Sequence, residues 1–144
     1  MKSMRDFVKV AEEHNALKRI KAEVDWNLEL SHIAKLNEEQ QGPALLFENV
    51  KDYTTPVITS VCTTTERLSL IMGMDPSSSL TQIMEEWVKI GDKLIPPKVV
   101  DKSAAPCKEN IMMGDEVDLY KFPTPQWYPL DGGRYLGTAH FIIS

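Results

Sequence analysis

The chain has 144 residues, of which 42% are hydrophobic and 26% charged, a composition typical of about one globular domain with a buried core. Its 16 basic and 21 acidic residues give a formal net charge of −5 and are interspersed, which argues against nucleic acid or an anionic membrane as a partner. No apolar stretch approaches the roughly 18 residues that span a bilayer, and no signal-peptide core is present, so we expect a cytoplasmic protein.

A helix, a strand and a second helix are predicted at the start of the chain. The first helix begins after a capping box at residues 3–6 and ends at His14. Residues 17–24 alternate in part between apolar and charged side chains, which predicts a half-buried strand. The second helix follows a cap at Asp25 or Asn27. Its predicted apolar face consists of Leu30, Ile33 and Ala34.

Two further strands and a third helix follow. Residues 44–47 form a short apolar run and residues 57–62 are rich in β-branched side chains, so both are predicted to be strands. A capping box at Thr63 opens the third helix, which ends near Gly73. Its predicted apolar face consists of Leu68, Ile71 and Met72.

The clearest helix begins after Ser79 and ends at Gly91, and we expect Trp87 on its apolar side to lie in the core. The other apolar residues on that side are Leu80, Ile83, Met84 and Val88. Helical and strand patterns alternate throughout the chain up to this point. The alternation predicts an α/β (mixed α+β) fold, with an α/β or α+β layer around a mixed sheet.

Residues 95–106 differ in character, because prolines flank a short β-type segment, and we predict a connector or domain edge there. Beyond it, residues 110–113 are predicted to form a strand and residues 118–120 a single turn. The sequence Asp-Gly-Gly at residues 131–133 predicts a tight turn that leads into a final strand ending at Ser144. Because that strand has no partner after it and no polar tail, we expect the chain to be the first part of a larger protein.

The side chains that could carry chemistry show no catalytic spacing. His14, His32 and His140 have no second His, Cys or acidic residue at metal-ligand spacing. The adjacent glutamates at 38–39 and 85–86 point about 100° apart on a helix, so neither pair forms an acid–base dyad. The two cysteines lie far apart and in no C-x-x-C pattern, which indicates a reducing compartment. No catalytic mechanism follows from these residues alone.

Two features stay open between a structural and a ligand-binding interpretation. The Gly132-Gly133 pair belongs to no phosphate-binding fingerprint and favours a tight turn, with close backbone approach to a ligand as the alternative. Trp127 and Tyr128 lie between prolines in an extended segment, where they line either a pocket or an interface.

Four motifs, in the order of the chain, resemble those of one enzyme family. They are MRDFV at residues 4–8 with LKRI and EVD at residues 17–25, GPALLFENVK at residues 42–51, ER and MG between residues 66 and 73, and PTPQWYPLDGGRY at residues 123–135. This series resembles the UbiD-like decarboxylases, the 3-octaprenyl-4-hydroxybenzoate carboxy-lyase type, and spans nearly the whole chain. One departure is Asp52, which stands where the family usually has glycine.

The resemblance implies an N-terminal α/β domain at residues 1–106. At residues 107–144 it implies the first strands of a split β-barrel, flavin-reductase-like cofactor domain. It further implies a reversible, non-oxidative decarboxylase that acts on an aromatic or α,β-unsaturated carboxylic acid through prenylated FMN, with Mn²⁺ and K⁺. The family-length protein is expected to be a homo-oligomer.

The family's cofactor contact corresponds to Thr138, whose hydroxyl can make one hydrogen bond, and Gly137 beside it would permit close approach. No catalytic residue and no metal ligand of the family has a counterpart in this chain, and we assign no catalysis to His140. The 144-residue chain alone is therefore expected to be inactive and to bind no cofactor.

Two other classes of function remain open. One is a non-catalytic assembly subunit whose final strand adds to the sheet edge of a partner that carries the missing site. The other is a flavin-binding module of reductase type. Size-exclusion chromatography with a candidate partner tests the first, and flavin absorbance after reconstitution with FMN tests the second.

Overall fold

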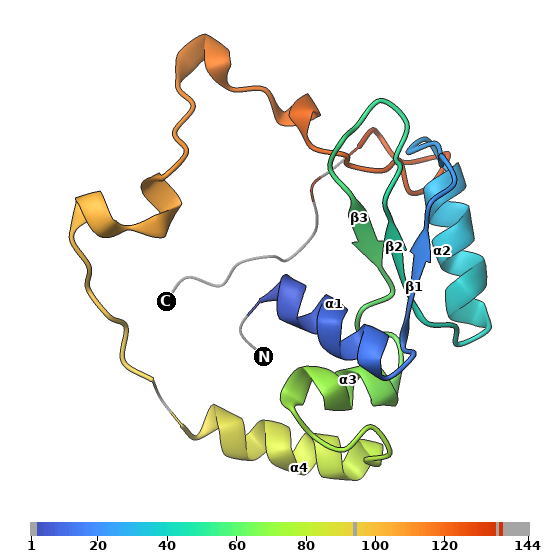
Figure 1. The fold of residues 1–144 in the computed structure, drawn as a ribbon, viewed down its shortest axis with the longest axis vertical. Helices are drawn as coiled ribbons and strands as arrows, with labels where there is room; N and C mark the ends of the chain where they lie inside the picture. Colours follow the sequence, from blue (N-terminus) through green and yellow to red (C-terminus); the bar gives the residue numbers. More distant parts are fainter. Residues whose placement is uncertain (1–2, 94, 135, 137–144) are drawn as a thin grey trace.

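The computed structural model describes residues 3–93, 95–134 and 136 of the chain. Within this part, helices cover a small three-stranded sheet, and a long segment leaves the packed region and returns to it (Figure 1). We call residues 95–122 the strap. The mixed α/β class predicted from the sequence is confirmed.

α1 (Met4–Glu13) forms where the sequence predicts it. The side-chain oxygen of Ser3 accepts a hydrogen bond of 3.2 Å from the Asp6 backbone N–H, which satisfies one unpaired donor of the first turn. His14 ends the helix, as predicted, with its backbone N–H bonded to the carbonyl of Val10. The buried residues of α1 are Phe7 and Ala11.

The sheet has the strand order β1-β2-β3 and consists of β1 (Leu17–Ile20), β2 (Ala44–Phe47) and β3 (Val57–Thr59). β1 runs parallel to β2, whereas β3 runs antiparallel to β2. α2 (Glu29–Glu39) lies in the connection between the two parallel strands, which cannot be joined by a tight turn. β2 matches its predicted range.

The strands β1 and β3 are shorter than the predicted strands at residues 17–24 and 57–62. Beyond β1, Val24 makes only an isolated parallel bridge with Val50. β3 ends at Thr59, because the next residue, Ser60, has a φ of 60°, which lies in the left-handed region and cannot continue an extended strand.

β2 is the centre of the fold, because both of its faces are buried. On one face, a cluster lies between the sheet and the helices α1 and α3, and it consists of Phe7, Ala11, Ala16, Ala44 and Leu70. On the other face, a cluster lies against α2 and consists of Val24, Leu30, Leu45, Phe47 and Val50. Burial on two sides explains why β2 reads as an unbroken apolar run rather than an alternating one.

α2 begins after both of its predicted caps. Leu28 occupies the N-cap position with a φ of 69° and no side-chain hydrogen bond. The Asp25 carboxylate instead accepts bonds of 2.8 Å from the Asn27 backbone N–H and from Lys51 Nζ. The Glu29 carboxylate accepts a bond of 2.8 Å from the Asp25 N–H. Asp25 therefore ties the loop before α2 to the loop after β2, and it caps no helix.

Gly42 follows α2 in a confined space. Its backbone N–H donates to the Asn37 carbonyl at 2.8 Å, and the Asn37 side-chain amide donates to the Pro43 carbonyl at 2.8 Å. A Cβ atom at position 42 would lie 2.1 Å from Asn37 Oδ1, so a larger residue would break this amide contact.

α3 (Thr65–Met72) lies in the predicted place but presents a different face to the interior. Thr64 caps it, one residue after the predicted cap, by accepting a bond of 3.4 Å from the Arg67 N–H. Gly73 ends it with a φ of 74°, as a left-handed C-cap. The predicted face of Leu68, Ile71 and Met72 is only half-buried. The fully buried residues are Arg67, Ser69 and Leu70.

Arg67 is the largest fully buried side chain, at 1% exposure. Its Nη1 donates to the Gly42 carbonyl at 2.9 Å, and its Nη2 donates to Thr63 Oγ1. Its Nε finds no partner among the described residues. Burial lowers the pKa of Arg67 from its ordinary value.

α4 (Leu80–Gly91) confirms the predicted capping box. The Gln82 N–H donates to Ser79 Oγ at 3.3 Å, and the Ser79 N–H donates to Gln82 Oε1 at 2.8 Å. The predicted burial of Trp87 is wrong, since its side chain is 65% exposed and only Ile83 of this helix is buried. The reason is that α4 packs along α3 at the edge of the packed unit (Figure 1).

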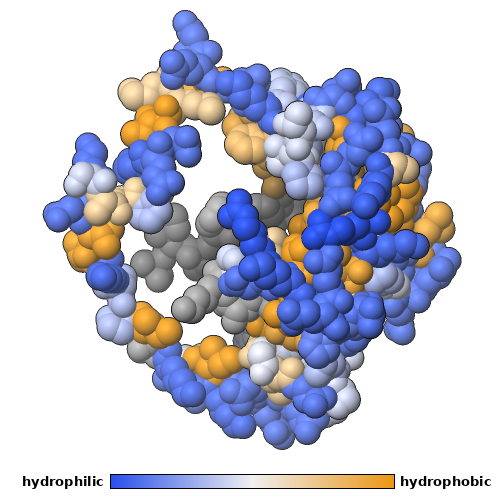
Figure 2. All heavy atoms as spheres, viewed as in Figure 1, coloured by the Kyte–Doolittle hydropathy of each residue, from blue (hydrophilic) through white to orange (hydrophobic). Residues whose placement is uncertain are grey.

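The strap carries four short 3-10 helices and no strand. These helices are Lys102–Ala104, Pro106–Lys108, Gly114–Glu116 and Leu119–Lys121. The strand predicted at residues 110–113 is wrong, since its apolar side chains are exposed and no strand of the described part lies beside them. Figure 2 shows hydrophobic patches at intervals along the strap and α4. Of the final predicted strand, only Arg134 and Leu136 are among the described residues.

Candidate functional site

The chain returns to the packed unit through residues 123–134, the return segment. It docks on the loop between β1 and α2, where Gln126 and Asn27 form an isolated parallel bridge. The Gln126 N–H donates to the Trp26 carbonyl at 3.0 Å, and the Leu28 N–H donates to the Gln126 carbonyl at 3.2 Å. Backbone hydrogen bonds therefore hold the return segment against the first half of the chain.

The turn that follows is held by its own side chains. Gln126 Nε2 donates to the Tyr128 carbonyl at 2.9 Å and to the Asp131 carbonyl at 3.4 Å. The Tyr128 N–H donates to Asp131 Oδ2 at 3.0 Å, and the Asp131 N–H donates to the Tyr128 carbonyl at 3.2 Å. The turn predicted at residues 131–133 therefore begins earlier, at Tyr128, and continues through bends at 131–133.

Arg134 lies among three aromatic rings that come from three parts of the chain. Its guanidinium carbon is 4.2 Å from the Trp26 ring centroid, 5.0 Å from that of Tyr120 and 5.9 Å from that of Tyr53. Each distance is within the range of about 6 Å in which a cation is attracted to the face of a ring. Its Nη1 also donates to the Tyr53 hydroxyl at 2.8 Å. We call these four residues the arginine cage.

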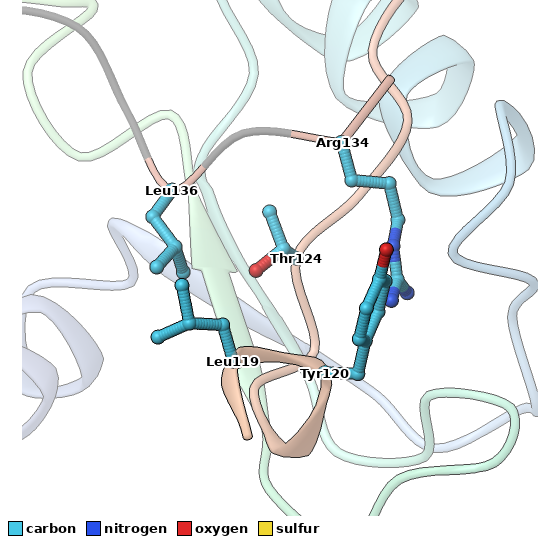
Figure 3. A pocket seen from close by; sticks show the side chains of 5 residues that line it. All are labelled: Leu119, Tyr120, Thr124, Arg134 and Leu136. Carbon is cyan, nitrogen blue, oxygen red and sulfur yellow. The ribbon is translucent and has the colours of Figure 1, made fainter. Parts of the chain in front are cut away.

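A cavity of about 300 Å³ lies beside the arginine cage. Its lining residues are Leu119, Tyr120, Thr124, Arg134 and Leu136. Figure 3 shows Tyr120 alongside the Arg134 side chain, the two leucines on the opposite side, and Thr124 between them. The cavity thus combines apolar walls with two hydroxyls, those of Tyr120 and Thr124, and one cation. This combination suits a small organic acid, and the volume is at the low end for such sites.

A second cavity, of about 400 Å³, lies between α1 and the three strands of the sheet. Its lining residues are Met4, Arg5, Val8, Lys9, Glu12, Arg19, Leu46, Pro56 and Ile58. Arg19 pairs with Glu12 and with Glu48, each at 2.5 Å. The hydrogen bond from Arg19 lowers the pKa of Glu12, and the bonds to both carboxylates raise the pKa of Arg19. The Arg19 charge at this cavity is therefore already matched by the protein.

Trp127 and Tyr128 contribute to a third, smaller cavity of about 70 Å³ against α2. The α2 residues that line it are Ser31, His32, Ala34, Lys35 and Glu38. A space of this size holds roughly two water molecules. Of the two interpretations open from the sequence, these aromatics line a pocket, but one too small for an organic ligand.

Of the site residues and histidines considered from the sequence, His14 and His32 are described, and they lie on different helices. Gly137, Thr138 and His140 lie outside the described residues. His14 ends α1 and His32 is exposed on α2. In residues 3–93, 95–134 and 136, no three His, Cys, Asp or Glu side chains are grouped so that they could hold a metal ion.

The arginine cage is not predicted by the sequence. The available signal was a basic residue directly after Asp-Gly-Gly, in a segment with several aromatic residues. Trp26 and Tyr53 could not be added from spacing, because neither lies near Arg134 in the sequence.

The ion pair between Asp25 and Lys51 predicts how the stability of the fold depends on pH. The bond from Lys51, and then that from the Asn27 N–H, lower the pKa of Asp25 below its usual 3.8. Such a carboxyl adds stability above its unfolded-state pKa and loses that contribution as the pH falls through its folded-state value. The drop in urea midpoint between about pH 6 and about pH 3 should therefore be smaller for Asp25→Asn than for the wild type. Asp115→Asn on the strap is the control, and an equal drop in all three proteins would contradict the prediction.

No helix in the described part of the chain has the length and apolar character needed to cross a bilayer.

The sequence matches two family models. The model of the 3-octaprenyl-4-hydroxybenzoate carboxy-lyase N-terminal domain matches residues 8–87, and that of the Rift-related domain of the same carboxy-lyase matches residues 98–144. The two matches follow one another in the chain and together cover most of it.

The fold is similar to those of several solved decarboxylases. The open form of vanillic acid decarboxylase from Sedimentibacter hydroxybenzoicus, with truncated ShVdcD, aligns with a TM-score of 0.83 and 32% identity over 94% of this chain and 30% of that chain. An evolved dimeric form of the UbiD-class enzyme HmfF from Pelotomaculum thermopropionicum, in complex with prFMN, aligns with a TM-score of 0.77 and 28% identity over 93% and 30%. The apo 3,4-dihydroxybenzoic acid decarboxylase of Klebsiella pneumoniae aligns with a TM-score of 0.72 and 26% identity over 90% and 28%. The chain thus spans about 30% of the length of the enzymes that it matches.

Proposed function

Because the chain belongs to the 3-octaprenyl-4-hydroxybenzoate carboxy-lyase family, we propose that it forms the N-terminal part of a reversible, non-oxidative decarboxylase. The observation that carries the proposal is the match to both family models in order, together with the similarity to vanillic acid decarboxylase at 32% identity. The proposed substrate is an aromatic or α,β-unsaturated carboxylic acid. The vanillic and 3,4-dihydroxybenzoic acid decarboxylases among the similar structures support the aromatic class.

We propose prenylated FMN as the cofactor of the family-length protein, with Mn²⁺ and K⁺ beside it. The prFMN complex of HmfF supports the flavin. The cofactor would supply the electron sink for loss of carbon dioxide, while the protein binds and orients the acid. The described residues offer no carboxylate or histidine group for the metal, so we derive no step through it. Gly137 and Thr138 remain the proposed cofactor contacts of this chain.

In this proposal residues 1–106 act as a folded N-terminal domain and residues 107–144 begin the cofactor domain. The described part contributes packing and orientation: the return segment is held by backbone bonds and by the arginine cage, close to where the proposed cofactor residues follow in sequence. We also propose a cytoplasmic location, which the two free, exposed cysteines support. A homo-oligomer is proposed for the family-length protein, and the dimeric form of HmfF supports it.

The test of the proposed function compares two lengths of the protein. The 144-residue chain and a version extended to the length of its relatives are each co-expressed with a flavin prenyltransferase, and carbon dioxide release from a panel of aromatic acids is measured. The extended protein is expected to decarboxylate at least one acid and to carry flavin absorbance. The short chain is expected to do neither. Decarboxylation by the short chain would contradict the proposal that catalysis needs the rest of the protein.

A second candidate is a non-catalytic assembly subunit, which the exposed apolar side of α4 favours. Its exposed apolar residues are Leu80, Met84, Trp87 and Val88. Light scattering after size-exclusion chromatography would distinguish the two. A stable complex with a separate catalytic subunit supports the assembly role, whereas catalysis by the extended chain without any partner rejects it.

A further inference from the structure

Arg134 joins three segments that are far apart in the chain. Trp26 belongs to the loop after β1, Tyr53 to the loop between β2 and β3, and Tyr120 to the last 3-10 helix of the strap. The hydrogen bond between Arg134 and the Tyr53 hydroxyl adds a directional contact to the ring contacts. One side chain at the end of the return segment therefore contacts two loops of the packed unit and the last helix of the strap.

The groups of the cage suit the guanidinium of arginine better than the ammonium of lysine. A guanidinium is planar, so it can stack on a ring and donate a hydrogen bond from its edge, whereas an ammonium is a compact and strongly hydrated charge. In the described part of the chain no carboxylate pairs with Arg134 within 4.0 Å. The rings and the Tyr53 hydroxyl are therefore the groups that determine where this side chain lies.

The cage and the backbone bridge share one residue. The Trp26 carbonyl accepts the Gln126 N–H at 3.0 Å, and the Trp26 ring lies 4.2 Å from the Arg134 guanidinium. The turn between Gln126 and Arg134 is braced internally by the Asp131 carboxylate. Because the turn is anchored at its two ends on the same tryptophan, it cannot shift without breaking the bridge or leaving the cage.

We propose that Arg134 is a positioning residue that holds the return segment on the N-terminal domain and so fixes the point from which the chain continues to Gly137 and Thr138. The last step of this inference rests on the proposed function, since it assigns those two residues to the cofactor. The holding step does not, because it concerns only contacts within the described residues.

Hydrogen exchange on the 144-residue chain tests the holding step. In Arg134→Met the amide of Gln126 is expected to exchange at least about tenfold faster than in the wild type, because local opening no longer breaks the cage contacts. Arg134→Lys keeps the charge and should give an intermediate increase. Amides of α1 and β2 should be unchanged in both variants, which excludes general unfolding. Arg5→Met removes an exposed arginine of α1 and is the matched control.

Substitutions of the residues that contact Arg134 provide a second test of the holding step. Tyr53→Phe keeps the ring and removes the hydroxyl, so it should accelerate Gln126 exchange less than Arg134→Met. Trp26→Leu removes the nearest ring, and the effects of Trp26→Leu and Arg134→Met should not add in the double variant. An unchanged exchange rate at Gln126 in Arg134→Met, or full additivity with Trp26→Leu, would overturn the proposal.

A second measurement separates this inference from the proposed function. In the extended, cofactor-loaded protein, Arg134→Met is expected to lower the flavin-to-protein absorbance ratio that survives gel filtration, and Arg134→Lys to lower it less. If exchange at Gln126 rises but flavin is fully retained, the link to the cofactor is overturned. If the wild-type extended protein binds no flavin, the proposed function fails, while the exchange data still decide whether Arg134 holds the return segment.

Discussion

Replacing Phe47 with alanine is expected to remove a large share of the stability of the chain. Phe47 is the last residue of β2, is 0% exposed, and lies in the cluster between the sheet and α2. Truncating a buried phenylalanine costs about 3–5 kcal/mol, because transfer energy is lost and a cavity remains. Typical domains have only about 5–15 kcal/mol in total, so the loss is a large share of it and the urea midpoint should fall clearly.

Urea unfolding followed by circular dichroism measures this effect. Leu130→Ala is the matched control, because Leu130 is 98% exposed and its truncation should change stability by no more than about 0.5 kcal/mol. Equal midpoints for the two variants would mean that the cluster on the α2 side of the sheet contributes little to folding.

Replacing Arg67 with methionine is expected to cost about 2–4 kcal/mol, as the net of two opposing effects. Methionine keeps an unbranched apolar stem in the same space. The loss comes from two bonds to a charged donor, each contributing about 1.5–3 kcal/mol, which leaves the Gly42 carbonyl and the Thr63 hydroxyl without that donor. The gain comes from removing a cation that is desolvated, as its lowered pKa indicates, and whose Nε is unpaired within the described part.

The free energy of unfolding in urea again decides the outcome. Arg5→Met makes the same chemical change at an exposed position of α1 and should be close to neutral. If Arg67→Met proved as stable as the wild type or more so, the cost of burying the cation would exceed what its two bonds contribute.

The parts of the fold that depend on residues close together in the sequence could be predicted from it. The caps at Ser3 and Ser79 are local, because each side chain bonds a backbone group three residues away. β2 was predicted with its full range because burial on both faces leaves an uninterrupted apolar run.

The errors in the fold arise from contacts with distant residues. The inward face of α3 was mispredicted because the Arg67 partner is the Gly42 carbonyl, and no pattern within α3 signals that contact. The apolar side of α4 was predicted correctly as apolar but wrongly as core, since periodicity identifies a face without showing what covers it. The same holds for residues 110–113, whose apolar side chains suggest a strand although no strand of the described part lies beside them.

The candidate site was harder to predict than the fold. The cage exists because two loops and one 3-10 helix from separate parts of the chain meet at Arg134, and the order of residues does not encode that contact. The resemblance to the decarboxylase family implies that Gly137 and Thr138, which follow the cage in sequence, contact the cofactor. Whether those two residues contact a cofactor stays a prediction.

The strap has a consequence for how the protein tolerates change in length. Since it leaves the packed unit after α4 and the return segment rejoins it at Trp26, the strap is a closed loop, and the bridge to Gln126 completes the ring. The entropy lost on closing a flexible loop grows only with the logarithm of its length, so doubling the loop costs only about 0.6 kcal/mol. Insertions in the strap should therefore change the free energy of unfolding very little. A single substitution at Trp26 or Gln126, where the loop closes, can instead release the return segment from the packed unit.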